Sequence, residues 1–175
     1  MTVILVGLPG SGKSTAGRQL ARHLDWPFAD SDHELEREFG TTIRDFFADH
    51  GEDAFRDREE QAIDHLAQPG RRVLATGGGA VLRPANRAAM KREGNVVVYL
   101  RASPEELARR LRHDTQRPLL QGGDALRKLR DLYRVRDPLY REVATFVLDA
   151  GRTSVPSLVH RLCMQMDMAG LSQAL

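Results

Sequence analysis

The residues at positions 7–14 have the types and the spacing of a loop that binds phosphate. They read Gly-Leu-Pro-Gly-Ser-Gly-Lys-Ser and match the pattern G-x-x-x-x-G-K-[ST]. The glycines let successive backbone N–H groups point inward around an anion. Lys13 can then reach the β- and γ-phosphates of a nucleoside triphosphate, and the Ser14 hydroxyl can join the coordination shell of Mg²⁺. The pattern predicts nucleotide binding, and it leaves open which group receives the phosphate.

Two carboxylates, Asp30 and Asp32, follow the next short apolar segment. If that segment is a strand of an open α/β sheet, its carboxyl end lies where such sheets bind ligands. Asp30 can then support Mg²⁺, while Asp32 accepts a hydrogen bond from a substrate hydroxyl and takes its proton. The alternative is that Asp32 only caps the helix that begins there. The residue types leave both interpretations open.

Three further groups could contact an acceptor molecule. Arg56 and Glu59 are three residues apart on a helical pattern, and the spacing alone favours a surface ion pair over a clamp for a carboxylate. Residues 77–79 are three glycines after a strand pattern, which favours backbone N–H groups close to a ligand over a simple tight turn. Arg136 comes two residues before Pro138, and the proline predicts a helix break that holds this arginine rigidly.

Residues 113–124 (HDTQRPLLQGGD) form a polar segment with glycines and weak periodicity. In a compact kinase such a segment is a candidate for a lid that closes over the nucleotide. Arg117 within it could stabilise the charge that develops on the transferred phosphoryl group. An ordinary surface loop is the alternative.

Short apolar segments alternate with helical patterns along the whole chain. Continuous apolar strands indicate a parallel sheet buried on both faces, and the alternation predicts an α/β fold with helices on both sides. No aspartate ends the third strand, so Mg²⁺ must depend on other groups. The predicted strands are Val3–Val6, Phe28–Ala29, Val73–Thr76, Val96–Leu100 and Phe146–Leu148. The predicted helices are Thr15–Leu24, Asp32–Phe39, Thr42–His50, Asp53–Leu66, Pro84–Arg92, Pro104–Arg112, Ala125–Arg136 and Ser157–Met168.

Composition narrows the class of protein. The 175 residues suffice for one core and are too few for two ordinary domains. The 26 basic and 24 acidic residues give a net charge of +2, which provides no electrostatic reason to expect a nucleic-acid or membrane partner. Only three of the basic residues are lysines, so Lys13 stands out. A single cysteine, the lack of a long apolar run and a first strand without a basic leader predict a cytoplasmic protein.

Taken together, these motifs resemble the shikimate kinase family over about residues 2–165. The phosphate loop is shared by many kinases, whereas Asp-x-Asp, the triple glycine and Arg-Pro-Leu-Leu in the lid are more specific. The other matching motifs are Phe55-Arg56 with Glu59-Glu60 and Pro138-Leu139-Tyr140-Arg141-Glu142-Val143-Ala144. The resemblance implies one kinase domain, residues 1–175, with a three-layer, five-stranded parallel sheet flanked by helices, a P-loop kinase fold with a lid. It places a substrate-binding helical region at about 32–66 and the lid at about 113–124.

The resemblance also implies a reaction, the transfer of the γ-phosphoryl group of MgATP to the 3-hydroxyl of shikimate on the route to chorismate and the aromatic amino acids. The implied catalytic residues are Lys13, Asp32 and Arg117, and the implied Mg²⁺ ligands are Ser14 and Asp30, the latter through water. Nucleotide-binding residues are Gly10, Ser11, Gly12, Lys13, Ser14, Thr15, Arg110, Arg117, Arg152 and Thr153, with Arg110 stacked on adenine. Shikimate-binding residues are Asp32, Arg56, Gly78, Gly79 and Arg136.

Two other functions deserve comparison. Another small-metabolite kinase, such as a gluconate kinase, would share the phosphate loop, but the triple glycine and Arg136 argue against it. A nucleotide-binding regulator without turnover would be expected to lack Lys13, Asp32 or the lid arginine, and all three are present. The expected partners are therefore ATP and shikimate, with no nucleic acid, no membrane and no obligate protein partner, and the expected state is a monomer.

Overall fold

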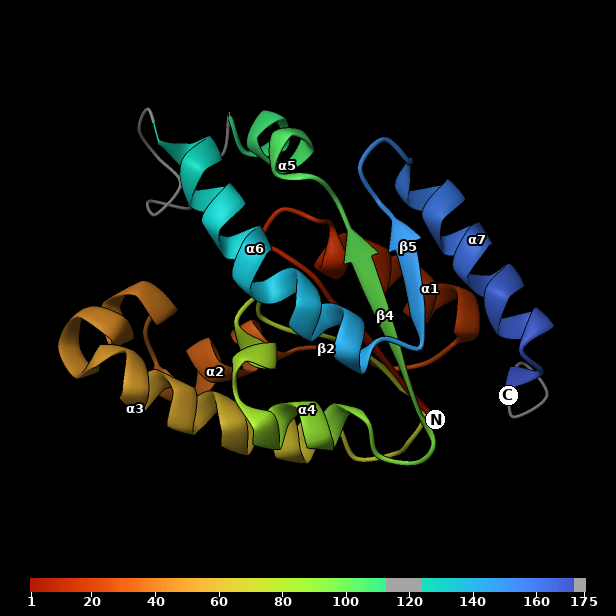
Figure 1. Cartoon of the computed structure of the whole chain (residues 1–175). Coiled ribbons are helices and arrows are strands. Elements are labelled where there is room, and N and C mark those ends of the chain that lie inside the picture. The colour runs from red at the N-terminus through yellow and green to blue at the C-terminus, as the bar shows by residue number, and fades with distance from the viewer. Residues whose placement is uncertain (113–123, 172–175) are drawn as a thin grey trace.

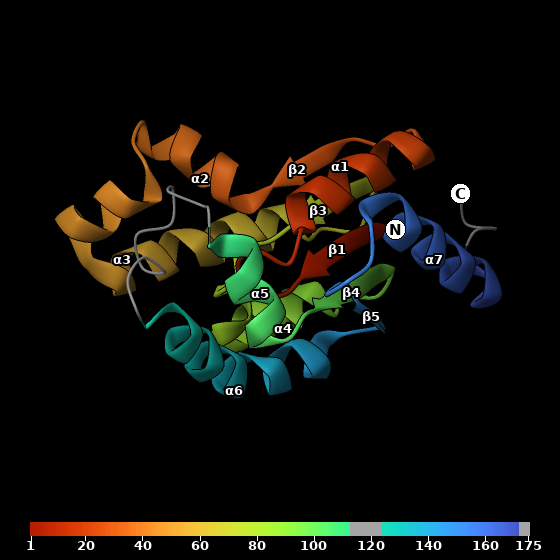
Figure 2. The same cartoon turned by 90° about the horizontal axis from the view of Figure 1, so that it is seen from above.

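Five parallel strands form the middle layer of the protein, and helices cover both of its faces (Figures 1 and 2). The structure is a computed structural model that describes residues 1–112 and 124–171. The strands lie in the order β2-β3-β1-β4-β5, and each neighbouring pair is parallel. They are β1 (Thr2–Val6), β2 (Phe28–Asp30), β3 (Arg72–Ala75), β4 (Asn95–Arg101) and β5 (Phe146–Asp149). The predicted α/β fold with a five-stranded parallel sheet is confirmed.

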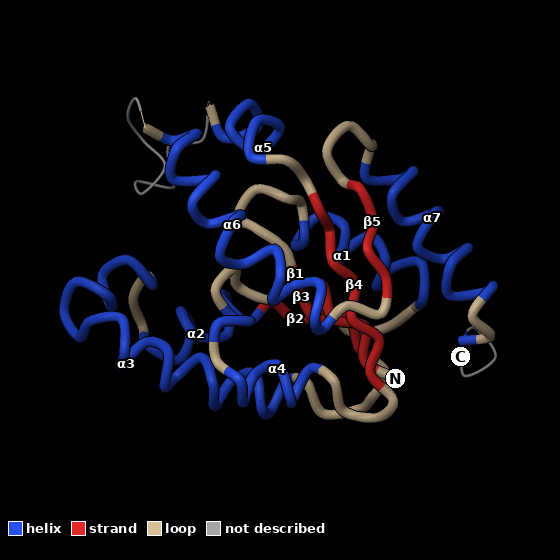
Figure 3. Tube along the Cα trace, viewed as in Figure 1, coloured by secondary structure: helices blue, strands red, loops and turns tan. Residues whose placement is uncertain are grey.

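Helices connect each strand to the next along the chain, and α7 follows the last strand, as Figure 3 shows by colour. Most ends of helices and strands lie within two residues of the predicted ones. Among the described residues, no helix combines the length and the apolarity that crossing a bilayer requires. The helices are α1 (Lys13–Leu24), α2 (Ser31–Phe39), α3 (Ile43–Leu66), the 3₁₀ helix η1 (Ala80–Leu82), α4 (Pro84–Met90), α5 (Pro104–Leu111), α6 (Ala125–Val143) and α7 (Val155–Met168).

Side chains of the central strand alternate between two hydrophobic cores, because successive residues of a strand point to opposite faces of the sheet. Val3 and Leu5 of β1 pack in the cluster that includes α1 and α7. Ile4 and Val6 pack in the cluster that includes α3, α4 and α6. This arrangement explains why β1 is apolar at every position from 3 to 6, and it makes the protein a three-layer structure.

α6 does not end where the sequence predicts. A helix break after Arg136 was expected from Pro138, but the helix continues to Val143 with the proline inside it. A proline inside a helix lacks an N–H to donate, and its ring crowds the carbonyl four residues earlier, at a cost of about 3 kcal/mol or more. Burial of Tyr140 and Val143 in the core offsets this cost, since both are nearly inaccessible to solvent. Arg136 therefore lies within a helix rather than at a break.

α3 joins two predicted helices, with a kink at Gly51, whose φ of 84° and ψ of 171° are not helical. The φ lies in the left-handed region that favours glycine. Together with α2, α3 encloses a small hydrophobic cluster of its own, formed by Leu35, Phe46 and Phe55. In Figures 1 and 2 this pair of helices extends from one side of the sheet.

Candidate active site

The phosphate loop connects β1 to α1 at the carboxyl edge of the sheet. Gly10 and Gly12 have φ values of 83° and 90°, which residues with a Cβ adopt only at a cost. Lys13 is the first residue of α1, and its Nζ donates hydrogen bonds to the carbonyl oxygens of Gly7 (2.8 Å) and Leu8 (2.9 Å). The ammonium group thus lies against the loop, at the N-terminus of a helix, where an anion is stabilised.

Asp30 lies at the end of β2 and connects it to both α1 and α2. Its Oδ2 accepts a hydrogen bond from the Ser14 hydroxyl at 2.5 Å. Its Oδ1 accepts from the N–H groups of Asp32 (3.0 Å) and His33 (3.4 Å), so that Asp30 is the N-cap of α2. Asp32 is in the first helical turn, and the alternative in which it serves only as the helix cap is wrong.

Ser14 and Asp30 suit Mg²⁺ because the ion prefers hard oxygen ligands, keeps several waters and uses one or two protein groups beside substrate phosphates. A hydroxyl and a carboxylate already in contact at the phosphate loop meet that requirement. Within residues 1–112 and 124–171, no group of three or more His, Cys, Asp or Glu side chains could hold a metal alone. The donor set therefore fits a magnesium ion shared with a nucleotide and does not fit a metal held by the protein alone.

Asp32 is partly buried and lies beside a fully buried carboxylate, Glu59, at the glycine loop after β3. A Cβ on Gly77 would lie 2.6 Å from Asp32 Oδ1 and 3.2 Å from Glu59 Oε2, so only glycine fits between them. Burial and then the charges of Asp30 and Glu59 raise the pKa of the Asp32 carboxyl to about 6, against the opposing charge of Lys13. A carboxylate with this pKa is suited to accept a proton near neutral pH.

Arg56 and Glu59 form a buried ion pair on α3, with Arg56 Nη1 2.7 Å from Glu59 Oε1. The side chains are 12% and 1% exposed, so the surface pair that the spacing favours is wrong. Burial raises the pKa of Glu59, although Arg56 opposes the shift by its charge and its hydrogen bond. The buried Nε of Arg56 has no hydrogen-bond partner among the described residues, and such a donor is costly unless a ligand accepts from it.

The same loop approaches the guanidinium groups of two helices. A Cβ on Gly79 would collide with the Arg56 guanidinium from α3. A Cβ on Gly78 would lie 3.3 Å from Arg136 Nη1 from α6. The structure therefore brings Arg56 and Arg136 to one glycine loop, although 80 positions separate them in the sequence.

Arg110 of α5 donates to Gly10 O (3.3 Å) and to Gly151 O (2.7 Å), and so joins the phosphate loop to the loop after β5. Arg152 lies on that second loop, where its side chain is 82% exposed, next to Thr153, whose hydroxyl bonds Asp149 O. Arg117 and the lid segment lie outside the described residues, apart from Asp124.

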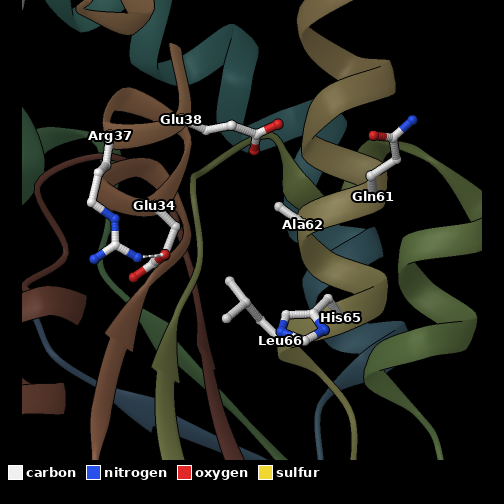
Figure 4. Close-up of a pocket in the computed structure, with 7 residues that line it drawn as sticks. All are labelled: Glu34, Arg37, Glu38, Gln61, Ala62, His65 and Leu66. Atoms are coloured by element: carbon white, nitrogen blue, oxygen red, sulfur yellow. Dashed lines mark hydrogen bonds and ion pairs between the residues drawn. The ribbon is translucent and has the colours of Figure 1, made fainter. Parts of the chain in front are cut away.

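A cavity of about 260 Å³ unites the phosphate loop with the two aspartates and the glycine loop. It is lined by Pro9, Gly10, Gly12, Lys13, Ser14, Thr15, Asp30, Asp32, Thr76, Gly77 and Gly78. A larger hollow of about 580 Å³ lies between α2 and α3 (Figure 4). Its lining includes Arg37 paired with Glu34 and contains none of the predicted site residues. The smaller cavity is the candidate active site, because it alone of these two brings the phosphate loop and the two aspartates together.

Comparison with known proteins identifies the family. A family model described as shikimate kinase matches residues 9–167. The chain belongs to the shikimate kinase family. A shikimate kinase of Paracidovorax citrulli is 53% identical over 174 residues, which cover 98% of this chain and 94% of that protein. The structure described as shikimate kinase from Acinetobacter baumannii in complex with shikimate is 41% identical, with a TM-score of 0.89 over 97% of this chain and 93% of that chain. The predicted resemblance is confirmed.

A gluconokinase from Sinorhizobium meliloti is also similar in structure. It has a TM-score of 0.57 and 21% identity, and the match covers 96% of each chain. At this identity the likeness shows a shared fold alone. The alternative of a gluconate kinase therefore has much weaker support than the shikimate kinase family, whose members are ATP-dependent kinases.

Two residues of this shikimate kinase family member have no role in the sequence-based prediction and yet lie at the site. Glu59 was noted for its spacing from Arg56 and as part of a family motif, and neither reveals whether the pair is buried. Tyr140 donates a hydrogen bond to Gly78 O at 2.6 Å across 62 positions of sequence. The motif Pro138-Leu139-Tyr140 was the available signal for this residue, but a motif alone does not show which group a hydroxyl contacts.

Proposed function

We propose that this chain transfers the γ-phosphoryl group of ATP to the 3-hydroxyl of shikimate, giving shikimate 3-phosphate and ADP. The bond from the γ-phosphorus to the bridging oxygen of ATP breaks, a bond to the 3-oxygen forms, and the hydroxyl proton goes to a base. The observation that carries the proposal is the meeting of a phosphate loop, a carboxylate of raised pKa and two arginines at one glycine loop. A 41% identical structure described as a complex with shikimate supports it.

On the nucleotide side, the backbone of residues 10–15 and the Lys13 ammonium bind the phosphates. The hydroxyl of Ser14 and the carboxylate of Asp30, which already accepts from Ser14, are the groups that would hold Mg²⁺. Bound there, Mg²⁺ would supply positive charge against the developing charge of the phosphates. The loop after β5 carries Arg152 and Thr153, and its Gly151 O accepts a hydrogen bond from Arg110. In this proposal these three residues contact adenine.

On the acceptor side, a carboxylate of shikimate pairs with the guanidinium groups of Arg56 and Arg136. The unpaired Nε of Arg56 supports this role, because a carboxylate can accept from it. Backbone groups of Gly78 and Gly79 contact the ring and its hydroxyls. Asp32 accepts a hydrogen bond from the 3-hydroxyl and takes its proton, for which its raised pKa is suited.

Residues 1–175 act as one kinase domain in this proposal, with substrate-binding helices at about 32–66 and a lid at about 113–124. The separate hydrophobic cluster of α2 and α3 supports a distinct substrate-binding region. The lid carries Arg117 to the phosphates and excludes water, which would otherwise compete as an acceptor. We further propose that the protein is a cytoplasmic monomer without an obligate protein partner.

The test is ADP release by the purified protein with MgATP and, in turn, no acceptor, shikimate or gluconate. We expect release that depends on shikimate and stays at background with gluconate. Release that gluconate supports equally well would favour the other small-metabolite kinase. A folded protein that binds ATP and releases no ADP with either acceptor would favour the regulator without turnover.

A further inference from the structure

Tyr140 is a buried tyrosine that reaches the glycine loop from α6. Its side chain is inaccessible to solvent, and its hydroxyl donates to Gly78 O at 2.6 Å. This hydrogen bond joins α6 to the loop after β3, two segments that are 62 positions apart. The carbonyl of Gly78 belongs to the loop whose backbone we place against the ring of shikimate.

The candidate carboxylate clamp lies beside the same glycine, Gly78. Arg136 lies one helical turn before Tyr140 on α6, and its Nη1 would lie 3.3 Å from a Cβ on Gly78, the residue whose carbonyl accepts from Tyr140. Burial raises the pKa of Tyr140, even though the charge of Arg136 opposes the shift. The hydroxyl therefore remains protonated, and it can donate to Gly78 O while its oxygen stays able to accept from Arg136.

We infer that Tyr140 is a positioning residue that holds the Arg136 guanidinium and the Gly78 backbone at a fixed separation, so that both can grip one acceptor molecule. The inference rests on the proposed function, since it assigns to Tyr140 the geometry of that same binding site. Tyr140 does not touch the reacting atoms. It acts through these two groups.

A second buried tyrosine provides a matched control. Tyr99 of β4 is 1% exposed, its ring centroid lies 4.9 Å from that of Tyr140, and its hydroxyl donates to Asp137 Oδ1 at 2.7 Å. Tyr99→Phe therefore removes a buried hydrogen bond to α6 from a neighbouring ring. Its hydroxyl is bonded to neither the glycine loop nor Arg136 in any hydrogen bond found among the described residues.

The experiment compares steady-state kinetics and urea unfolding of wild type, Tyr140→Phe and Tyr99→Phe. For Tyr140→Phe we expect KM for shikimate to rise about tenfold, the effect of one buried hydrogen bond, with kcat lowered less than about threefold and KM for ATP within about twofold. For Tyr99→Phe we expect a similar loss of stability and KM for shikimate within about twofold of wild type. The separation of KM from stability is the signature of positioning.

An unchanged KM for shikimate in Tyr140→Phe would overturn the inference, and so would an equal rise of this KM in Tyr99→Phe. In either case, turnover by the wild type would still support the proposed function. A wild type without shikimate-dependent ADP release would instead overturn the proposed function and the inference with it. The two failures are therefore distinguishable.

A second measurement does not require Tyr140→Phe to fold. Protein that contains 3-fluorotyrosine gives fluorine signals from its three tyrosines, which Tyr99→Phe and Tyr133→Phe assign by elimination. Shikimate should shift the Tyr140 signal, because the carboxylate engages Arg136, whose charge acts on this hydroxyl, and should leave Tyr99 within the linewidth. A Tyr140 signal that does not move at saturating shikimate would contradict the inference.

Discussion

Replacing Asp32 by asparagine should stabilise the protein near neutral pH while it removes most of the turnover. The Asp32 carboxyl has a pKa of about 6 in the folded protein against a reference value of 3.8, mainly because the charged form is buried near Asp30 and Glu59. The folded protein thus binds this proton more tightly than the unfolded chain does. Stability is lost as pH rises from about 4 to about 6, and the full penalty persists at higher pH.

The magnitude follows from the difference of about two pKa units, each of which corresponds to about 1.4 kcal/mol. Asp32→Asn should therefore raise the free energy of unfolding by up to about 3 kcal/mol at about pH 8 and by only about 1 kcal/mol at about pH 4.5. The larger figure is an upper bound, because the residue is partly exposed and water screens its charge. The amide retains a hydrogen-bonding group but cannot take a proton, so kcat should fall by at least about 100-fold.

Urea unfolding across this pH range, without nucleotide, Mg²⁺ or shikimate, measures the stability, and ADP release measures kcat. Asp49→Asn on the exposed surface of α3 is the matched control, for which we expect less than about 0.5 kcal/mol of change. A stability difference for Asp32→Asn that is absent, reversed or constant with pH would refute the electrostatic reasoning. Shikimate affinity lost as strongly as kcat would show that Asp32 mainly positions the substrate.

Three other expected outcomes follow from the same geometry. In the wild type, kcat/KM for shikimate should fall as pH drops through about 6, because protonated Asp32 cannot act as the base, and a flat profile from about pH 5 to 8 would contradict that role. Arg136→Lys keeps the charge but loses the two-pronged guanidinium, so KM for shikimate should rise at least about tenfold with KM for ATP unchanged, whereas an unchanged KM for shikimate would remove Arg136 from the site. Gly79→Ala places a methyl group against the Arg56 guanidinium, which its bond to Glu59 holds in place. KM for shikimate should therefore rise about tenfold, and the free energy of unfolding should fall by about 1–3 kcal/mol. Calorimetry of shikimate binding and urea unfolding check this, and an unaltered affinity would contradict the contact.

Much of the fold and part of the site could be predicted because the signals are local. The phosphate loop is predicted from glycines at fixed spacing next to Lys13. The strand β1 is predicted from an unbroken apolar run, which is typical of a buried strand. The N-cap of α2 was harder to predict, because Asp30 and Asp32 are both residue types that cap helices. Only the end of β2 shows that Asp30 is the cap. The end of α6 was predicted wrongly because the packing of residues 140 and 143, which outweighs one proline, is a tertiary effect.

The acceptor side of the site depends on contacts between distant segments. The spacing of Arg56 and Glu59 indicates that they can pair, but their burial follows from the glycine loop after β3 and from the cluster around Phe55. The bridge from Tyr140 to Gly78 joins two elements that neither local propensity nor hydrophobic periodicity relates. These contacts emerge only when the parallel sheet brings the carboxyl ends of its strands to one edge.

The identity of the product that the purified protein forms from MgATP and shikimate decides whether the 3-hydroxyl is the acceptor. Phosphorus–proton correlation NMR should show one phosphoryl group, coupled to the proton at carbon 3, formed in equal amount to ADP. A phosphoryl group at another hydroxyl, or ADP accompanied only by inorganic phosphate, would contradict the account of how Asp32, Arg56 and Arg136 orient the acceptor.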